Sequence, residues 1–283
     1  SSLDHVGYFT TNVEDACTML EVLAGRDDRD MTSSLRPVEA YRDHLNSDLH
    51  GKVIGVLENV QEVIRDQAVR DNVEALCEKL AARGAQIRRV RMPQELMETI
   101  LPVYLTIANA EATANHSNLD GIRFGMREDG ESVEEVMKNS RTKGFSAYVR
   151  KRFIIGSYSL FVENQDKLFR KAQKIRRLLV DHYRALFAEC DCILASAAPT
   201  VAPLEDEASD EALGKEHLVA DNHMQLGNFS GYPSMTLPSG FVDGLPIGVN
   251  ITCRPFEEQM MFDIAKAIEE ETGLADHTVE VKA

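Results

Sequence analysis

The side chains that could do chemistry lie in three short stretches. Arg152 begins the apolar helical stretch 153–156, where a guanidinium either lies along apolar neighbours or meets a carboxylate. Asp120 and Arg123 lie in a glycine-bounded loop, as a turn pair or as part of a cleft. In 228–248, two turns rich in Gly and Pro bracket short apolar stretches, which is typical of a hairpin. From these residue types alone, the structural and ligand-binding interpretations both stay open.

The cysteines give little support to a metal site or a disulfide framework. The chain has five cysteines, an odd number, and four of them lie in apolar or strand-like runs. Cys190 and Cys192 are separated by one residue, which is too close for an ordinary zinc or redox pair. We therefore expect no bound metal and no disulfide framework.

A basic run on one predicted helix is compatible with RNA binding or with a solvated helix face. Its members are Lys167, Arg170, Lys171, Lys174, Arg176 and Arg177. Aromatic residues between them are sparse, and the formal net charge of the chain is -15, which repels a phosphate backbone. The sequence therefore favours the solvated face and argues against stand-alone nucleic-acid binding.

The elements that must position these residues alternate between strands and helices. An apolar run at 52–57 and an extended stretch at 86–91 flank a helical pattern at 69–80, which predicts a βαβ unit. Strands are also predicted at 192–196, 234–237 and 247–252. This alternation indicates one α/β unit.

The remaining helices are predicted from caps and periodicity. The first helix is expected to begin with Thr11 as its cap, and another begins at Ser132. The stretch 94–118 is helical in pattern, with a kink at Pro102. Two helices fit 145–187, interrupted at Gly156.

Length and composition exclude several classes of protein. The chain has 283 residues, of which 43% are hydrophobic and 27% are charged, close to the average for globular proteins. No stretch approaches the roughly 20 apolar residues that a membrane span needs. We expect a cytoplasmic protein without a membrane segment.

Several separated motifs, in the same order, resemble the amidase-signature family and within it the A subunits of tRNA-dependent amidotransferases. The segments that carry the resemblance are 1–4, 13–16, 111–125, 152–158, 171–176 and 228–248. The resemblance implies an α/β/α fold with a mixed central sheet. It also implies that residues 1–283 are the C-terminal portion of an amidase-signature domain, present without its N-terminal portion.

The family resemblance implies glutaminase chemistry by a Ser nucleophile, a bridging Ser and a Lys base. In the family these three residues lie in a Gly/Ser-rich segment ahead of the Ser-Ser-Leu-Asp motif. No Gly-Gly-Ser segment occurs in this sequence. We therefore expect no catalytic residue in this chain, and no glutamine hydrolysis by the chain alone.

The resemblance further implies that the substrate-recognition residues of the family are present. Free glutamine carries a carboxylate and an ammonium group, so a selective pocket needs a cation and an acid. Matching the motifs assigns substrate binding to Tyr104, Arg152 and Asp221. The alternative interpretations are a core aromatic, a helix-surface arginine and a surface-loop acid.

By this resemblance, the chain belongs to a heterotrimer with B and C subunits. The A subunit hydrolyses glutamine, and the B subunit uses the ammonia with ATP and Mg²⁺ to amidate misacylated tRNA, giving Gln-tRNA(Gln) or Asn-tRNA(Asn). The chain itself is expected to bind no cofactor and to meet tRNA only through the B subunit. Two alternatives stay open: another amidase-signature amidohydrolase, and a noncatalytic binding or assembly protein.

Overall fold

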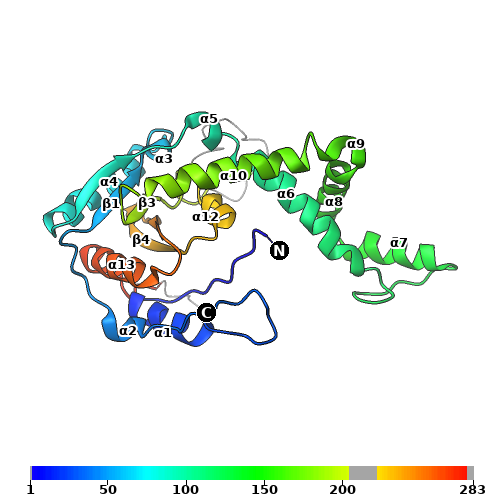
Figure 1. Cartoon of the computed structure of the whole chain (residues 1–283), viewed down its shortest axis with the longest axis horizontal. Helices are drawn as coiled ribbons and strands as arrows, with labels where there is room; N and C mark the ends of the chain where they lie inside the picture. The colour runs from blue at the N-terminus through cyan, green and yellow to red at the C-terminus, as the bar shows by residue number, and fades with distance from the viewer. Residues whose placement is uncertain (1, 204–221, 279–283) are drawn as a thin grey trace.

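The computed structural model describes residues 2–203 and 222–278, which contain a five-stranded mixed sheet, with its strands in the left part of Figure 1. The strands are β1 (Val53–Leu57), β2 (Gln86–Val90), β3 (Cys192–Ser196), β4 (Ser234–Val242) and β5 (Leu245–Cys253). Their spatial order is β2-β1-β3-β5-β4. Strand β1 runs parallel to β2 and β3, whereas β5 runs antiparallel to β3 and β4.

The predicted βαβ unit is confirmed. Helix α4 (Gln67–Ala82) connects β1 to β2, and the two strands pair in parallel from Val53 with Gln86 to Leu57 with Val90. The Asp66 side chain caps α4 by accepting a hydrogen bond from the Ala68 backbone N–H at 2.9 Å. The helix therefore begins where its apolar periodicity begins.

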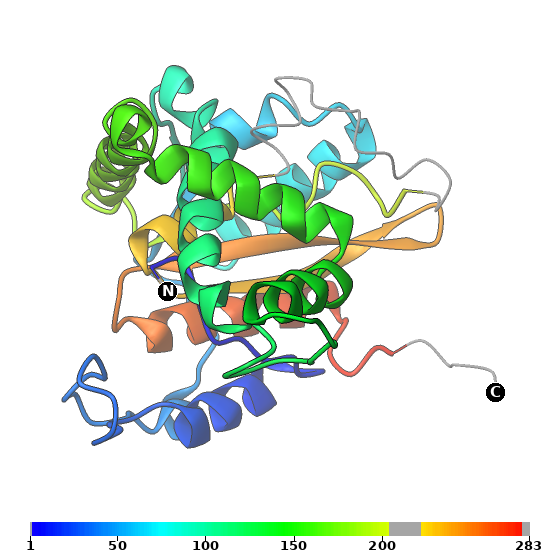
Figure 2. The ribbon, with the colours of Figure 1, turned by 90° about the vertical axis from the view of Figure 1, so that its right-hand side faces the viewer.

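Helices cover both faces of the sheet, which confirms the α/β/α fold. One face carries α1 (Val13–Leu23), α2 (Tyr41–His44), α4 and α13 (Glu258–Thr272). The other carries α3 (Glu58–Gln61), α5 (Gln94–Met97), α6 (Ile100–Asn115), α10 (Phe169–Leu186) and α12 (Gln225–Ser230). In Figure 2, α13 and α1 lie below the long strands β4 and β5, and α12 lies above them.

Side chains on the central strands alternate between two hydrophobic cores. On β3, Ile193 and Ala195 join one core, whereas Cys192 and Leu194 join the other. All five residues of β3 are buried. The strand is therefore apolar throughout, as expected when helices cover both faces of a sheet.

A group of helices extends from this body. It contains η1 (His116–Asn118), α7 (Val133–Gly144), α8 (Ala147–Leu160) and α9 (Val162–Gln165). Helix α6 leads out from the body, α8 packs against it, and α10 leads back along the sheet (Figure 1).

The N-terminal caps of α1 and α7 can be compared with the caps predicted from the sequence. The cap of α1 is Asn12, whose side chain accepts from the Asp15 N–H at 2.7 Å, so the prediction of Thr11 was wrong by one residue. The predicted cap at Ser132 is confirmed, because its side chain accepts from the Glu135 N–H at 3.2 Å.

The expected interruptions at Pro102 and Gly156 were wrong. The stretch 94–118 is divided before Pro102, since α5 ends at Met97 and α6 begins at Ile100, and Pro102 lies in the first turn of α6, where a missing N–H costs no helical hydrogen bond. Gly156 lies inside α8, where a Cβ would stand 2.1 Å from the Asn109 carbonyl oxygen. The stretch 145–187 contains three helices rather than two, separated near Phe161 and Asp166.

Strands β4 and β5 form the predicted hairpin, but both strands are longer than the sequence indicated. Asp243 (φ 51°) and Gly244 (φ 80°) turn the chain with left-handed conformations. The register shifts between Pro238 and Gly240. Strand β4 is the outer strand at its side of the described sheet.

The described residues were compared with what a membrane span, a metal site and a disulfide each require. No helix among residues 2–203 and 222–278 combines the length and apolarity that crossing a membrane requires. Within the same residues, no group of three His, Cys, Asp or Glu side chains is arranged to hold a metal ion. The five cysteines are buried free thiols.

Candidate functional site

Arg152 lies on α8 with its guanidinium held by one neighbour on the same helix. Its Nη2 donates a hydrogen bond to the Tyr148 hydroxyl at 2.7 Å, and the guanidinium carbon lies 4.6 Å from the centre of that ring. Among the described residues, no acidic side chain forms an ion pair with Arg152. Because a guanidinium has five N–H donors, most of them stay available for a carboxylate ligand.

Close packing against α6 fixes the position of α8. The Thr113 hydroxyl on α6 donates a hydrogen bond to the Phe153 carbonyl oxygen on α8 at 3.1 Å, and Gly156 allows the two backbones to approach. A Cβ at Gly156 would lie 2.3 Å from the Thr113 hydroxyl oxygen. The residue that sequence reasoning treated as a break therefore holds the arginine-bearing helix in place.

Tyr104 lies on α6 and is half-buried. It packs against the core above the sheet, and its ring centre lies 6.3 Å from that of Phe229 on α12. The structure places Tyr104 and Arg152 on two helices that pack together, but it gives the two side chains different partners. Asp221, the third predicted binding residue, lies outside the described residues.

A polar cluster that the sequence did not predict lies beside Tyr104. Arg176 on α10 donates to the Phe229 carbonyl oxygen from Nε at 3.1 Å and to the Ser2 carbonyl oxygen from Nη2 at 2.7 Å. Both the backbone N–H of Ser2 (2.8 Å) and its hydroxyl donate to the Glu111 carboxylate. Burial raises the pKa of Glu111, but hydrogen bonds that include those from Ser2 outweigh it and lower the pKa overall.

This cluster joins four of the motifs that carried the resemblance. Asn228 extends it, because its side-chain amide donates to the Leu3 carbonyl oxygen at 2.8 Å. Segments 1–4, 111–125, 171–176 and 228–248 therefore meet at one point of the fold. The cluster orders the chain around residue 2 and connects it to the helix that carries Tyr104.

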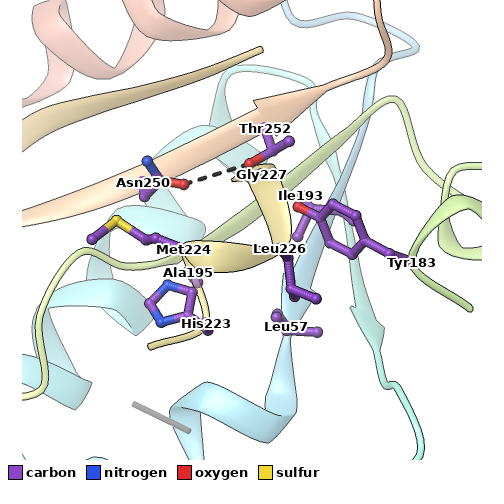
Figure 3. A pocket seen from close by; sticks show the side chains of 10 residues that line it. All are labelled: Leu57, Tyr183, Ile193, Ala195, His223, Met224, Leu226, Gly227, Asn250 and Thr252. Atoms are coloured by element: carbon purple, nitrogen blue, oxygen red, sulfur yellow. Dashed lines mark hydrogen bonds between the residues drawn. The ribbon is translucent and has the colours of Figure 1, made fainter. Parts of the chain in front are cut away.

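A small cavity lies between helices α10 and α12 and strands β1, β3 and β5 (Figure 3). Its lining includes Tyr183, His223 and Thr252, and the Thr252 hydroxyl donates to the Asn250 side-chain oxygen at 3.5 Å. The space open to a water molecule is about 10 Å³, enough for about one water. The cavity is therefore too small for an amino acid, and we do not assign substrate binding to it.

The glycine-bounded loop is a structural turn. The Asp120 carboxylate accepts from the backbone N–H groups of Ile122 (2.9 Å) and Arg123 (2.8 Å) and from Arg123 Nε (2.8 Å). The two backbone hydrogen bonds are the main reason that the pKa of Asp120 falls to about 2. Of the two interpretations, the turn pair is therefore the one the structure bears out.

Comparison with known proteins identifies the family. The amidase family model matches residues 1–262. The A subunit of the glutamyl-tRNA(Gln) amidotransferase of Koribacter versatilis is 36% identical over 271 residues, which cover 95% of this chain and 56% of that protein. The corresponding protein of Pseudomonas aeruginosa is 36% identical over 266 residues, covering 94% of this chain and 54% of that protein.

The chain belongs to the amidase family.

Solved structures of amidase-family proteins share its fold. The crystal structure of the glutamyl-tRNA(Gln) amidotransferase A subunit from Thermotoga maritima superposes with a TM-score of 0.73 at 28% identity, covering 96% of this chain and 54% of that chain. A bacterial aryl acylamidase superposes with a TM-score of 0.72 at 20% identity, covering 95% and 54%, a likeness that shows the fold alone. This amidase-family chain spans about half the length of the relatives it matches.

Sequence patterns alone do not predict the polar cluster of this amidase-family chain. Glu111 was named only within the segment 111–125, and Arg176 within the basic run and the segment 171–176, and nothing in their spacing indicates that they meet around Ser2. The sequence offered no signal for the cluster, because the partial burial of Arg176 on α10 is visible only in the structure. A half-buried arginine in an otherwise solvated basic run indicates a specific partner.

Proposed function

We propose that this chain is the glutamine-recognition portion of the glutaminase A subunit of a tRNA-dependent amidotransferase. Support comes from the amidase family match and from relatives with that name that are 36% identical over almost the whole chain. The compartment we propose is the cytoplasm, where charged tRNA and ATP are available.

The observation that carries this proposal is the environment of Arg152. Its guanidinium is oriented by Tyr148 and has no ion pair with a described acidic residue. A planar cation in this state suits bidentate binding of an α-carboxylate. In the proposal, Asp221 binds the α-ammonium group and Tyr104 contributes to the pocket wall.

We further propose that the nucleophile is supplied from outside this sequence. The Ser, bridging Ser and Lys of the family occur in a Gly/Ser-rich segment, and the 283 residues contain no Gly-Gly pair. Recognition groups without a nucleophile bind the amide but offer no acyl-enzyme route. The chain alone is then a noncatalytic portion of the enzyme.

In the assembled enzyme we propose, the B subunit holds ATP and Mg²⁺ and amidates Glu-tRNA(Gln), Asp-tRNA(Asn) or both with the ammonia released. A small C subunit completes the heterotrimer. This chain binds neither ATP nor the metal ion in the proposal, and its own small-molecule ligand is glutamine.

A second candidate is another amidohydrolase of the same family. An aryl acylamidase and a peptide amidase share the fold, with TM-scores of 0.72 and 0.71. An apolar amide needs neither a guanidinium nor an acid in its pocket, so an Arg152 without an ion pair to any described acidic residue favours glutamine.

Ligand binding separates the two candidates. We would titrate the 283-residue chain with L-glutamine and, separately, with the neutral amide propionamide, using ligand-observed NMR. Glutamine recognition predicts binding of L-glutamine that Arg152→Ala weakens at least tenfold and that Arg150→Ala, an exposed arginine on the same helix, leaves unchanged. Equal binding of both ligands, or equal loss in both variants, would overturn the proposal.

A further inference from the structure

Positive charge is concentrated in one part of this acidic chain. Residues 138–177 contain twelve Lys and Arg but only two Asp and Glu, a net charge of +10. Since the whole chain carries -15, the remaining residues carry -25. We call residues 138–177 the basic arm. It comprises the end of α7, all of α8 and α9, and the first half of α10, and much of it lies at the end of the molecule remote from the strands (Figure 1).

Two groups stand out among the cations of the basic arm, apart from Arg141, Arg152 and Arg176, which hydrogen-bond to carbonyl or hydroxyl oxygens. Some already have acidic partners, as in the pairs Lys143 with Glu128 (2.5 Å) and Arg170 with Asp166 (2.9 Å). Others are exposed and form no ion pair with any acidic side chain of residues 2–203 and 222–278. The second group consists of Lys138, Arg150, Lys151, Lys167, Lys171 and Lys174.

Three lysines of the second group lie at or just before the start of α10. Lys167 lies two residues before Phe169, the first residue of α10, and Lys171 and Lys174 lie on that helix three positions apart. Like charges at this spacing repel one another and destabilise a helix. An anion bound beside Lys171 and Lys174 would offset that repulsion, and Lys167 adds a third cation next to the start of the helix.

Exposed aromatic rings lie between the two sets of cations. Tyr158 and Phe161, at the end of α8, are 56% and 53% exposed, and their ring centres lie 6.5 Å apart. The cations on α8 precede these rings in the chain, and those around α10 follow them. Unpaired bases stack on exposed aromatic rings, whereas an acidic protein surface needs only the cations. The combination therefore favours a nucleic acid over an acidic protein.

We propose that the basic arm is a contact surface for RNA. Lys167, Lys171 and Lys174 contact phosphates, and Tyr158 or Phe161 stacks against an unpaired base. At physiological salt, charges further than about 8 Å away are largely screened, so a phosphate near the arm is attracted mainly by the cations of the arm. The acidic remainder of the chain repels the same polyanion and so directs it towards the arm. This inference rests on the proposed function, in which tRNA is a substrate of the assembled enzyme. It differs from two expectations drawn from the sequence, that the basic run is a solvated helix face and that only the B subunit meets tRNA.

The test compares two triple variants that have the same net charge. In the arm variant, Lys167, Lys171 and Lys174 are all replaced by Gln. In the body variant, Arg29, Arg42 and Lys79 are replaced by Gln; these are also exposed and form no ion pair with a described acidic residue. Fluorescence anisotropy with labelled bacterial tRNA, at several salt concentrations, measures the dissociation constant for each chain.

We expect the arm variant to bind tRNA at least tenfold more weakly than the parent. The slope of log K against log salt should fall by about 2 to 3, since each lost phosphate contact removes about 0.7 to 0.9. The body variant should stay within about twofold of the parent. Phe161→Leu should weaken binding to single-stranded RNA more than binding to duplex RNA. Circular dichroism melting curves confirm that each variant is folded.

Three results would overturn the proposal. The first is that the parent chain does not bind tRNA, and the second is that both triple variants lose the same amount of affinity for tRNA. The third is that labelled poly-L-glutamate binds the arm more tightly than tRNA does, which would identify an acidic protein surface as the partner. Glutamine binding measured on the same chains keeps this inference distinct from the proposed function. A chain that binds glutamine through Arg152 but binds no tRNA contradicts the RNA contact alone.

Discussion

The Phe229 carbonyl oxygen accepts two hydrogen bonds from the guanidinium of Arg176, from Nε at 3.1 Å and from Nη2 at 3.0 Å. The same guanidinium donates to Ser2, so one side chain of α10 connects the start of the chain to the end of α12. Hydrogen bonds from a charged donor are among the stronger polar interactions in folded proteins.

Arg176→Ala should therefore lower the free energy of unfolding by about 1.5 to 3 kcal/mol, because the carbonyl oxygens of Phe229 and Ser2 lose a charged donor. Urea denaturation followed by circular dichroism measures the change. Arg177→Ala is the control: this neighbour is exposed and pairs with Asp181, so its loss should change the value by less than about 1 kcal/mol. Equal effects of the two variants would contradict a specific role for Arg176.

Gly156→Ala should separate α8 from α6. The new methyl group would lie 2.1 Å from the Asn109 carbonyl oxygen, and backbone atoms yield little. We expect a loss of about 3 kcal/mol in the free energy of unfolding, at the upper end of the range for overpacking. Gly7→Ala is the matched control, since a Cβ there meets nothing within 4 Å. A melting temperature for Gly156→Ala equal to that of Gly7→Ala would show that the contact between the helices is loose.

Asp120 should give the folded state part of its acid sensitivity. Its pKa is lowered from 3.8 to about 2, chiefly by hydrogen bonds from the Arg123 and Ile122 N–H groups. The unfolded chain therefore takes up this proton at higher pH than the folded chain, and stability falls as the pH drops from about 5 to about 2. Asp120→Asn should reduce the decrease in unfolding free energy over this range, measured by urea denaturation at several pH values. An unchanged pH dependence would contradict the assignment.

Arg152→Ala should change glutamine recognition more than chemistry. In an amidotransferase whose A subunit contains this chain, we expect KM for glutamine to rise about 30-fold or more, since truncating one member of a buried charged contact costs about 2 to 5 kcal/mol. The value of kcat should fall less than kcat/KM, because the contact lies away from the reacting amide. Steady-state kinetics measures both constants.

Two controls define the role of Arg152. Amidation of tRNA with ammonia supplied directly should survive the change, and Arg150→Ala should leave KM for glutamine unaltered. If Arg152→Ala keeps KM within about twofold of the parent, or also abolishes the ammonia-dependent reaction, then Arg152 is a structural residue.

The isolated 283-residue chain should release no ammonia from glutamine above background, because the proposed binding groups lack a nucleophile. A coupled assay with glutamate dehydrogenase measures ammonia directly, with the heat-denatured chain as reference. Turnover by the pure chain would show that a nucleophile is present among its own residues.

The inner strands β1 and β3 were predictable from sequence because each is a short apolar run. Residues 192–196, for example, are all buried, and a five-residue apolar run that ends near a proline is typical of a buried strand. Glycine and proline misled the prediction, because their meaning depends on tertiary context. Gly156 permits a close helix contact, and Pro102 occupies a first turn whose start no local signal marks.

The candidate site was predictable only in part. Arg152 and Tyr104 were named because a motif carries them, but no motif shows that Tyr148 orients the arginine. The residues of the Ser2, Glu111 and Arg176 cluster are distant in sequence, with the first two separated by 109 positions. Only the folded chain brings such residues together.

The irregular edge of the sheet has a consequence for association between chains. Strand β4 is the outer strand of the described sheet, and its pairing with β5 is shifted between Pro238 and Gly240. Proline offers no N–H to an added strand, and an irregular register bends the edge away from a flat template. Non-native strand addition is therefore limited to short segments on either side of Pro238, which protects this edge against amyloid-like stacking.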